Sequence, residues 1–547
     1  MAQLIGIFGF LVVLLRAAIM CLQAVAVGGI LFLLVVAHSQ EQRSEGLLRS
    51  AWRLIRWSAL GLALAQLFFV ITNSLVLTYS TAIPIRSVMN ANFVWAGTLA
   101  MAGGIALYAW PPGLREHVGS LALVPAGMMM AGSVMTSHSA SRMEDRALLV
   151  TLTALHYLAT ASWIGGLPYL LLSGRRVEDR EARNESLARF SRLAQISVAA
   201  LLLAGLGMSF VYVGSIRAMW GTAYGVMLGA KISLFIVLLL LGAANFYIVR
   251  GLKTDTGTGT ASLLRFGEVE IGIGLSVILA AASMTSQPPS VDLTEGRVSM
   301  HEIVERFAPR MPRFSSPDLK EISPSTEQMV KNAVAAGKTV PAAFLPGESM
   351  GVNTSTPADI AWSEYNHNVA GLVVFLMGIL ALLSRSRYFS WAKIWPLTFL
   401  LLAVFLFFRA DPENWPMGPN GFWESFAVTD VLQHRAAVVL IIIFAIFQYR
   451  VETKRLKSMA AALVFPAVCA IGGVVLLTHT HALSNVKEEL LAELSHTPLA
   501  IFGIVAGWSR WLELRLPEDD QASKYLAWVW PVCFILVGMI LMDYHEA

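Results

Sequence analysis

Apolar runs of about 20 residues, the length that an α-helix needs to cross a bilayer, recur along this 547-residue chain. Hydrophobic residues make up 56% of it and charged residues only 14%, unlike soluble globular domains. We interpret these runs as helices, because strands of a membrane barrel need only about ten residues. The sequence therefore predicts an all-α, polytopic integral membrane protein with about 14 transmembrane helices. They are expected near residues 4–37, 53–79, 91–110, 119–137, 147–173, 192–215, 225–249, 265–285, 362–384, 391–409, 430–449, 457–478, 493–514 and 523–543.

Lysine and arginine are distributed unevenly among the connections between these runs. They concentrate in every second connection, which is the pattern of cytoplasmic loops. This places both termini on the outer, periplasmic side. The first run has neither a basic start nor a small-residue cleavage site, so we expect a retained helix and not a signal peptide.

One long connection, residues 286–360, is rich in proline, serine and charge and has no run long enough to span. It separates an eight-helix membrane domain, 1–285, from a six-helix domain, 361–547, and is expected on the outer side. The chain shows no basic patch for nucleic acid, no Walker A sequence, no CxxCH haem-attachment motif and no serine-hydrolase elbow. The sequence therefore predicts neither a nucleic-acid partner nor an ATP-driven pump, and we expect no enzymatic activity.

Nine of the 11 histidines fall at the outer ends or in the outer halves of the predicted spans, or in the outer loop. Imidazole is a common ligand for copper, zinc, iron and nickel. The alternative is that single interfacial histidines only meet water and lipid there. As a set they predict a metal-binding layer, with the candidate ligands His138, His156, His367, His434, His479, His481 and His496.

Three of these histidines surround the charged segment in "LLTHTHALSNVKEELLAELSH", residues 476–496. Asn485 and Glu488 resemble a capping box, which would begin a short helix that returns His496 toward His479 and His481. Residues two apart on a helix point about 160° from each other. We therefore expect the span to end at or just after His479, and at least two of these imidazoles, His367 and His434 included, to come within ligand-sharing distance.

Other polar and sulfur-containing residues lie within the spans. Arg16, central in the first span, needs a partner or water. Lys231 is expected to extend toward the membrane surface. Thioethers beside His138 suit Cu(I) but equally suit packing; they belong to Met128, Met129, Met130 and Met135.

The segment "LTALHYLATASWIGGLPYLLL", residues 152–172, precedes an R-F-S-R entry to the next span, a "YGVMLGAKISLF" span and an S-x-x-P type exit. These features, in this order, resemble the CopD copper-resistance domain over about residues 140–290. The helices at 4–137 look like the N-terminal half of that family, and the six-helix C-terminal half looks like the extension of its longer members.

The resemblance implies a multi-pass protein of the bacterial inner membrane that contributes to copper resistance. It would take copper, as Cu(I) or Cu(II), at the periplasmic face and import it. The family's periplasmic-side histidines correspond to His138 and His156. A small CopC-type copper carrier would be a separate protein, because the chain begins directly with a span. Two alternatives remain open: an electron-transfer protein whose histidines hold b-type haem, and a copper-binding or docking protein without transport.

Overall fold

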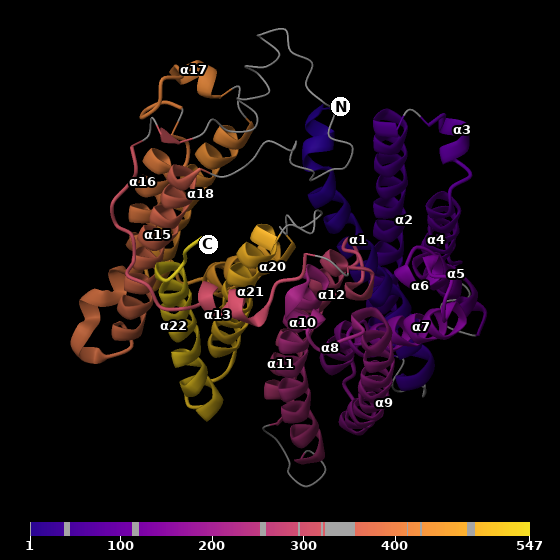
Figure 1. Cartoon of the computed structure of the whole chain (residues 1–547). Helices are drawn as coiled ribbons and strands as arrows, with labels where there is room; N and C mark the ends of the chain where they lie inside the picture. Colours follow the sequence, from indigo (N-terminus) through magenta and orange to yellow (C-terminus); the bar gives the residue numbers. More distant parts are fainter. Residues whose placement is uncertain are drawn as a thin grey trace. The chain divides into compact units, whose positions relative to one another are not determined.

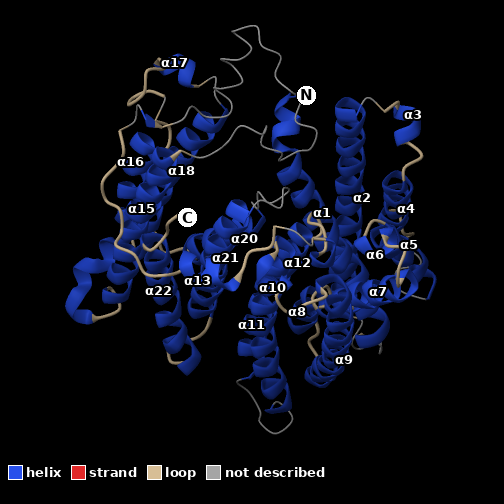
Figure 2. Ribbon diagram, viewed as in Figure 1, coloured by secondary structure: helices blue, strands red, loops and turns tan. Residues whose placement is uncertain are grey.

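The computed structural model describes residues 2–37, 44–81, 83–111, 120–251, 259–293, 296–318, 321–322, 356–412, 414–426, 429–478 and 487–546. Within these residues the chain is helical and has no strand (Figure 2). It forms two compact units, which meet in the sequence between Arg297 and Val298. We describe each unit by itself.

The first unit contains the helices that the sequence predicts for the N-terminal half, with short helical turns between them (Figure 1). In chain order they are α1 (Ala2–Leu31), η1 (Phe32–Val36), α2 (Glu45–Thr81), α3 (Ile85–Val88), α4 (Asn92–Tyr108), η3 (Ser120–Ala122), α5 (Leu123–Met135), α6 (His138–Ser141), α7 (Arg146–Trp163), α8 (Leu167–Arg176), α9 (Arg180–Val213), α10 (Ala218–Gly221), α11 (Ala223–Gly251), α12 (Gly259–Met284) and η4 (Ser290–Asp292).

The second unit contains the helices of the C-terminal half (Figure 1). They are α13 (Met300–Arg306), α15 (Pro357–Leu383), η6 (Arg387–Leu397), α16 (Thr398–Arg409), α17 (Phe422–Ser425), α18 (Thr429–Glu452), α19 (Met459–Ala462), α20 (Val464–Thr478), α21 (Lys487–Arg515) and α22 (Gln521–Met542).

Ten helical segments of the described residues are long and apolar enough to cross a membrane. Two further apolar helices, α4 and α5, are shorter, with 17 and 13 residues. The predicted class, a helical multi-pass membrane protein, is therefore confirmed. The two remaining predicted spans coincide with α12 and α21. The count of 14 spans and the outward orientation of both termini stay predictions.

The predicted span at 147–173 is interrupted by a turn, because Gly165 and Gly166 separate α7 from α8. This break lies against α1. A methyl group on Gly165 would lie 1.8 Å from the Ala24 carbonyl oxygen, and one on Gly28 would lie 2.4 Å from the Gly165 carbonyl carbon. The two backbones are thus in direct contact, and only a residue without a side chain fits between them.

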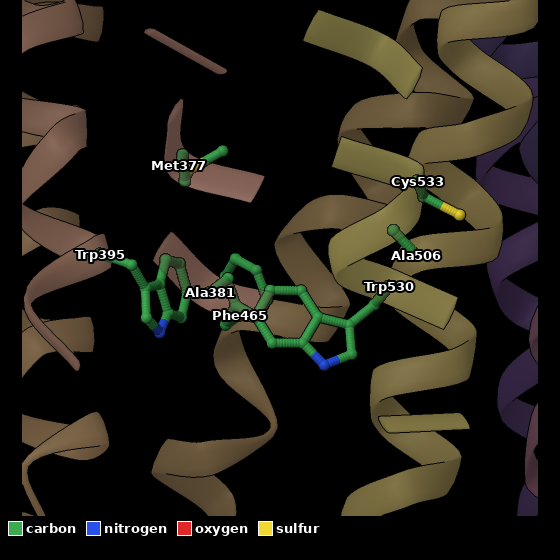
Figure 3. Packing of buried hydrophobic residues seen from close by; sticks show 7 residues of the cluster. All are labelled: Met377, Ala381, Trp395, Phe465, Ala506, Trp530 and Cys533. Carbon is green, nitrogen blue, oxygen red and sulfur yellow. The ribbon is translucent and has the colours of Figure 1, made fainter. Parts of the chain in front are cut away.

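Aromatic rings fill the centre of the second unit (Figure 3). Trp395, Phe465 and Trp530 are each at most 1% exposed, and neighbouring ring centroids lie 5.1 to 5.4 Å apart. Cys533 belongs to the same buried cluster, so this thiol packs as a small apolar side chain. The cluster joins η6, α20 and α22 with α15 and α21.

Candidate functional site

The first unit contains a cavity of about 390 Å³ that is lined mainly by apolar side chains. It is partly open to the surface, where the lining residues Leu206 and Ile236 are exposed. Residues from α1, α6, α7, α9, α11 and α12 form its wall. Two of the predicted metal ligands, His138 from α6 and His156 from α7, both line it. Helices distant in sequence thus bring the two imidazoles to one space.

The ring of His138 has a nitrogen that is open to a ligand. Its Nε2 atom is buried with no hydrogen-bond partner in the described part of the chain. The backbone of Thr285 lies close enough to act on the ring electrostatically. A neutral histidine ring keeps a lone pair on one nitrogen, and with this lone pair it binds a metal ion.

The electrostatic surroundings keep His138 neutral. Its burial, and then the positive charge of Arg16, lower the pKa of His138 below the usual 6.5, against the opposing effect of the Thr285 backbone. Because only the neutral ring can bind a metal, His138 is ready to act as a ligand at neutral pH.

His156 lies in the middle of α7, where its carbonyl oxygen accepts a hydrogen bond of 2.8 Å from the Thr160 hydroxyl. Its Nδ1 atom is buried and, among the described residues, has no hydrogen-bond partner. Lys231 of α11 lines the same cavity and acts on His156 electrostatically. Lys231 thus borders the same cavity as His156, and its extension toward the membrane surface stays a prediction.

Methionine sulfur also borders the cavity, but from residues that the sequence did not indicate. Met20, Met208 and Met284 line it, and the Met208 sulfur accepts a hydrogen bond of 3.4 Å from Thr153. Within an apolar span, a methionine that faces a cavity has the same sequence signature as one that faces lipid. No sequence signal therefore distinguished them.

The methionines that the sequence did indicate mostly serve packing. Met128 and Met129 lie against Gly103 of α4, and Met130 packs on a buried cluster that includes Val27. Met135 alone of the four lines a cavity. This is a second space of about 290 Å³, whose wall also includes Arg16, Ser137, His138 and Thr285.

Ser137, His138 and Thr285 belong to the walls of both cavities, so they form the partition between them. Arg16 fixes this partition from the smaller cavity: its Nη1 atom donates to the Thr285 carbonyl oxygen at 2.8 Å and to the Thr285 hydroxyl at 3.1 Å. Arg16 therefore has the partner that its position in the first span requires.

In the second unit, His367 and His496 come together. Their ring centroids are 5.7 Å apart, and Tyr544 stacks on His367 at 3.9 Å. His367 Nδ1 lies 2.8 Å from the Ser363 carbonyl oxygen, and this contact orients the ring. The expected approach of at least two imidazoles is met by this pair.

His434 does not join that pair. Its Nδ1 atom is 2.7 Å from the buried carboxylate of Asp411, which belongs to the loop after α16. His479, His481 and Asn485 lie outside the described residues, as do His38 and His117; α20 ends at Thr478, directly before this gap. Among the described residues, no group of three or more His, Cys, Asp or Glu side chains is arranged to hold a metal ion.

Residues 184–284 match the family model described as "Copper resistance protein D". A relative, "Copper transport protein CutJ" of Bacillus subtilis (strain 168), is 33% identical over 165 residues, which are 30% of this chain and 29% of CutJ. The match thus spans less than a third of that relative. No solved structure matches the chain.

The helical spans and these similarities define a membrane protein related to copper handling. Residues 184–284 thus carry the CopD domain that the sequence resembles, which confirms that resemblance. The matched segment includes α11 and α12, which contribute Lys231 and Met284 to the cavity wall, whereas His138 and His156 precede it.

Proposed function

We propose that this protein transports copper across the bacterial inner membrane, and that the larger cavity of the first unit binds the ion during transport. The observation that carries the proposal is the pair of partly buried imidazoles, His138 and His156, each with a buried ring nitrogen that has no partner among the described residues. A buried nitrogen without a hydrogen bond costs free energy, and coordination of a metal ion by that nitrogen would offset the cost.

The surroundings of the cavity favour Cu(I) over Cu(II). Thioether sulfur is a ligand for Cu(I), and three methionines border the space. Arg16 and Lys231 add positive charge near the two imidazoles. Coulomb repulsion is twice as large for a divalent ion as for a monovalent ion at the same distance. The proposed cargo is therefore the monovalent ion.

The proposed route begins on the periplasmic side. Copper would pass from the smaller cavity, beside Met135, across the partition at His138 and into the larger cavity with His156, and then leave on the cytoplasmic side. A separate CopC-type carrier would deliver it. The protein would catalyse no covalent reaction.

The pair formed by His367 and His496 would be an additional copper-binding position in the second unit, with His434, His479 and His481 as further candidate ligands. The orientation of the His367 ring by Ser363 supports this assignment. CutJ is named as a copper transport protein, which supports transport here.

Metal analysis and uptake measurements test the proposal. Purified protein should retain copper, and membrane vesicles of known orientation should accumulate it only when the protein is present. If the vesicles take up no copper although the protein binds it, the protein is a storage or docking protein. A Soret absorption band at stoichiometric intensity would instead support the haem alternative.

The predicted orientation has its own test. A reporter fused after Lys454 should report cytoplasm, and one inserted near Lys331, outside the described residues, should report periplasm, because the basic residues concentrate in alternate loops. The opposite pattern would place the proposed entry cavity on the cytoplasmic side and reverse the proposed direction.

A further inference from the structure

A carboxyl group inside the first unit takes no part in the route described above. Glu270 of α12 is 2% exposed. Its Oε1 atom accepts a hydrogen bond of 2.9 Å from the Asn245 side chain of α11. The Asn245 oxygen is itself buried and unpartnered within the described residues. An ionisable residue within a span points to a function, because the bilayer makes it costly.

Glu270 lies directly beyond the end of the copper cavity. Gly274, one turn further along α12 and about 6 Å away along the axis, lines that cavity. On α11, a methyl group added to Gly242 would lie 3.5 Å from Glu270 Oε1 and also 3.5 Å from Trp163 Cζ2. Trp163 lines the cavity. Glu270 Oε1 and Trp163 Cζ2 therefore lie at most about 7 Å apart.

Two cations of the neighbouring helices are engaged elsewhere, and two others, Arg176 of α8 and Arg250 of α11, are exposed. On the side of Glu270 away from the cavity, Arg175 of α8 and Arg265 of α12 both pair with Glu268, at 3.2 and 2.7 Å. Tyr169 of α8 donates to the Val25 carbonyl oxygen.

The two cations on the other side are distant from Glu270. Arg16 of α1 bonds Thr285, about 22 Å further along α12. Lys231 is about 21 Å from Asn245 along α11. Among the described residues of α1, α8 and α11, Glu270 thus faces a neutral amide and no cation. A buried carboxylate without a compensating cation is strongly disfavoured, so the resting group carries a proton.

We propose that Glu270 is a proton-binding site that exchanges its proton for the passing copper ion. When the monovalent ion moves from the cavity past Trp163, the carboxyl group releases its proton and the carboxylate balances the charge of the ion. When copper leaves, the group takes up a proton again. One proton therefore leaves for each copper ion that arrives, so no net charge accumulates. This inference rests on the proposed function and adds a charge-balancing step to it.

Proton release on copper binding tests the exchange. Purified full-length protein in weakly buffered solution at about pH 6.5 receives Cu(I), and a pH-sensitive dye records the protons released. The wild type should release about one proton per copper ion more than Glu270→Gln. The glutamine side chain keeps the size of glutamate and its bond to Asn245. Protons that histidines release on binding copper are the same in both proteins, so they cancel when the two measurements are subtracted.

Glu268→Gln is the matched control, because it lies on the same helix but pairs with surface arginines; it should release protons like the wild type. Glu270→Asp should restore part of the release. An infrared difference spectrum of the wild type should show that the protonated carboxyl band is lost when copper binds.

The outcomes separate the two proposals. If Glu270→Gln binds copper and releases as many protons as the wild type, the proposed proton exchange is wrong. The proposal that the protein transports copper would still stand. If the folded variant binds no copper, Glu270 is a ligand and not a proton carrier. If the wild type itself binds no copper, the proposed function fails, and the exchange fails with it.

Discussion

Replacing His138 or His156 with alanine should lower the affinity for copper by about 10- to 100-fold or more. Even the loss of a group that only hydrogen-bonds a metal ligand lowers metal affinity by about that much. Each variant removes one of the two imidazoles that line the cavity. The apolar length of the spans is unchanged, so membrane insertion should be normal. Competition with a chromogenic Cu(I) chelator measures the affinity, and copper tolerance of cells at equal expression gives a second readout.

His301→Ala provides the control. Its side chain is 88% exposed on α13 in the second unit, so its loss should leave the affinity unchanged. If both cavity variants bind copper as tightly as the wild type and their cells tolerate copper equally, the two imidazoles are not ligands. The candidates for copper binding would then be the histidines of the second unit.

The second large effect is structural. Gly165→Ala should destabilise the protein by about 3 kcal/mol or more, the upper range for overpacked sites, because the added methyl group overlaps the Ala24 backbone. The midpoint of thermal unfolding in detergent should fall by about 5 to 10 °C. Copper binding should weaken as well, since α1 and α7 both contribute to the cavity wall.

Gly127→Ala is the matched substitution, because a methyl group at Gly127 meets nothing within 4 Å. In the interior of a helix it should be neutral or slightly stabilising. Equal unfolding midpoints for the two variants would show that the close backbone contact between α1 and the α7–α8 break is not required for stability.

The sequence predicted the class of the fold, because the constraint that the bilayer imposes is local. A span has to be apolar over about 20 residues and must satisfy its backbone internally, and both properties can be read from a single window. Local chemistry could not show that the span at 147–173 breaks at Gly165. That break follows from the contact with Ala24, which is distant in the sequence.

For the candidate site, the sequence identified residue types and their approximate depth. His138 and His156 belong to the predicted outer layer of histidines and correspond to the periplasmic-side histidines that the CopD resemblance implies, and the structure places both in one cavity. The sequence also predicted that imidazoles of the C-terminal half would approach each other, and His367 and His496 do so. It did not predict that His434 pairs with Asp411 instead.

The sequence by itself determined a helical multi-pass membrane protein with a CopD-like segment, since hydropathy and local motifs are properties of neighbouring residues. Only the tertiary structure decided which side chains share a space. Met20, Met208 and Met284 look like ordinary members of apolar helices until helix packing places them around one cavity. Glu270 likewise becomes distinctive only through its burial against the neutral side chain of Asn245. The reason is physical: the side of a helix that faces a neighbour is fixed by contacts between distant segments, and a span that is apolar all round does not encode that side in its own pattern.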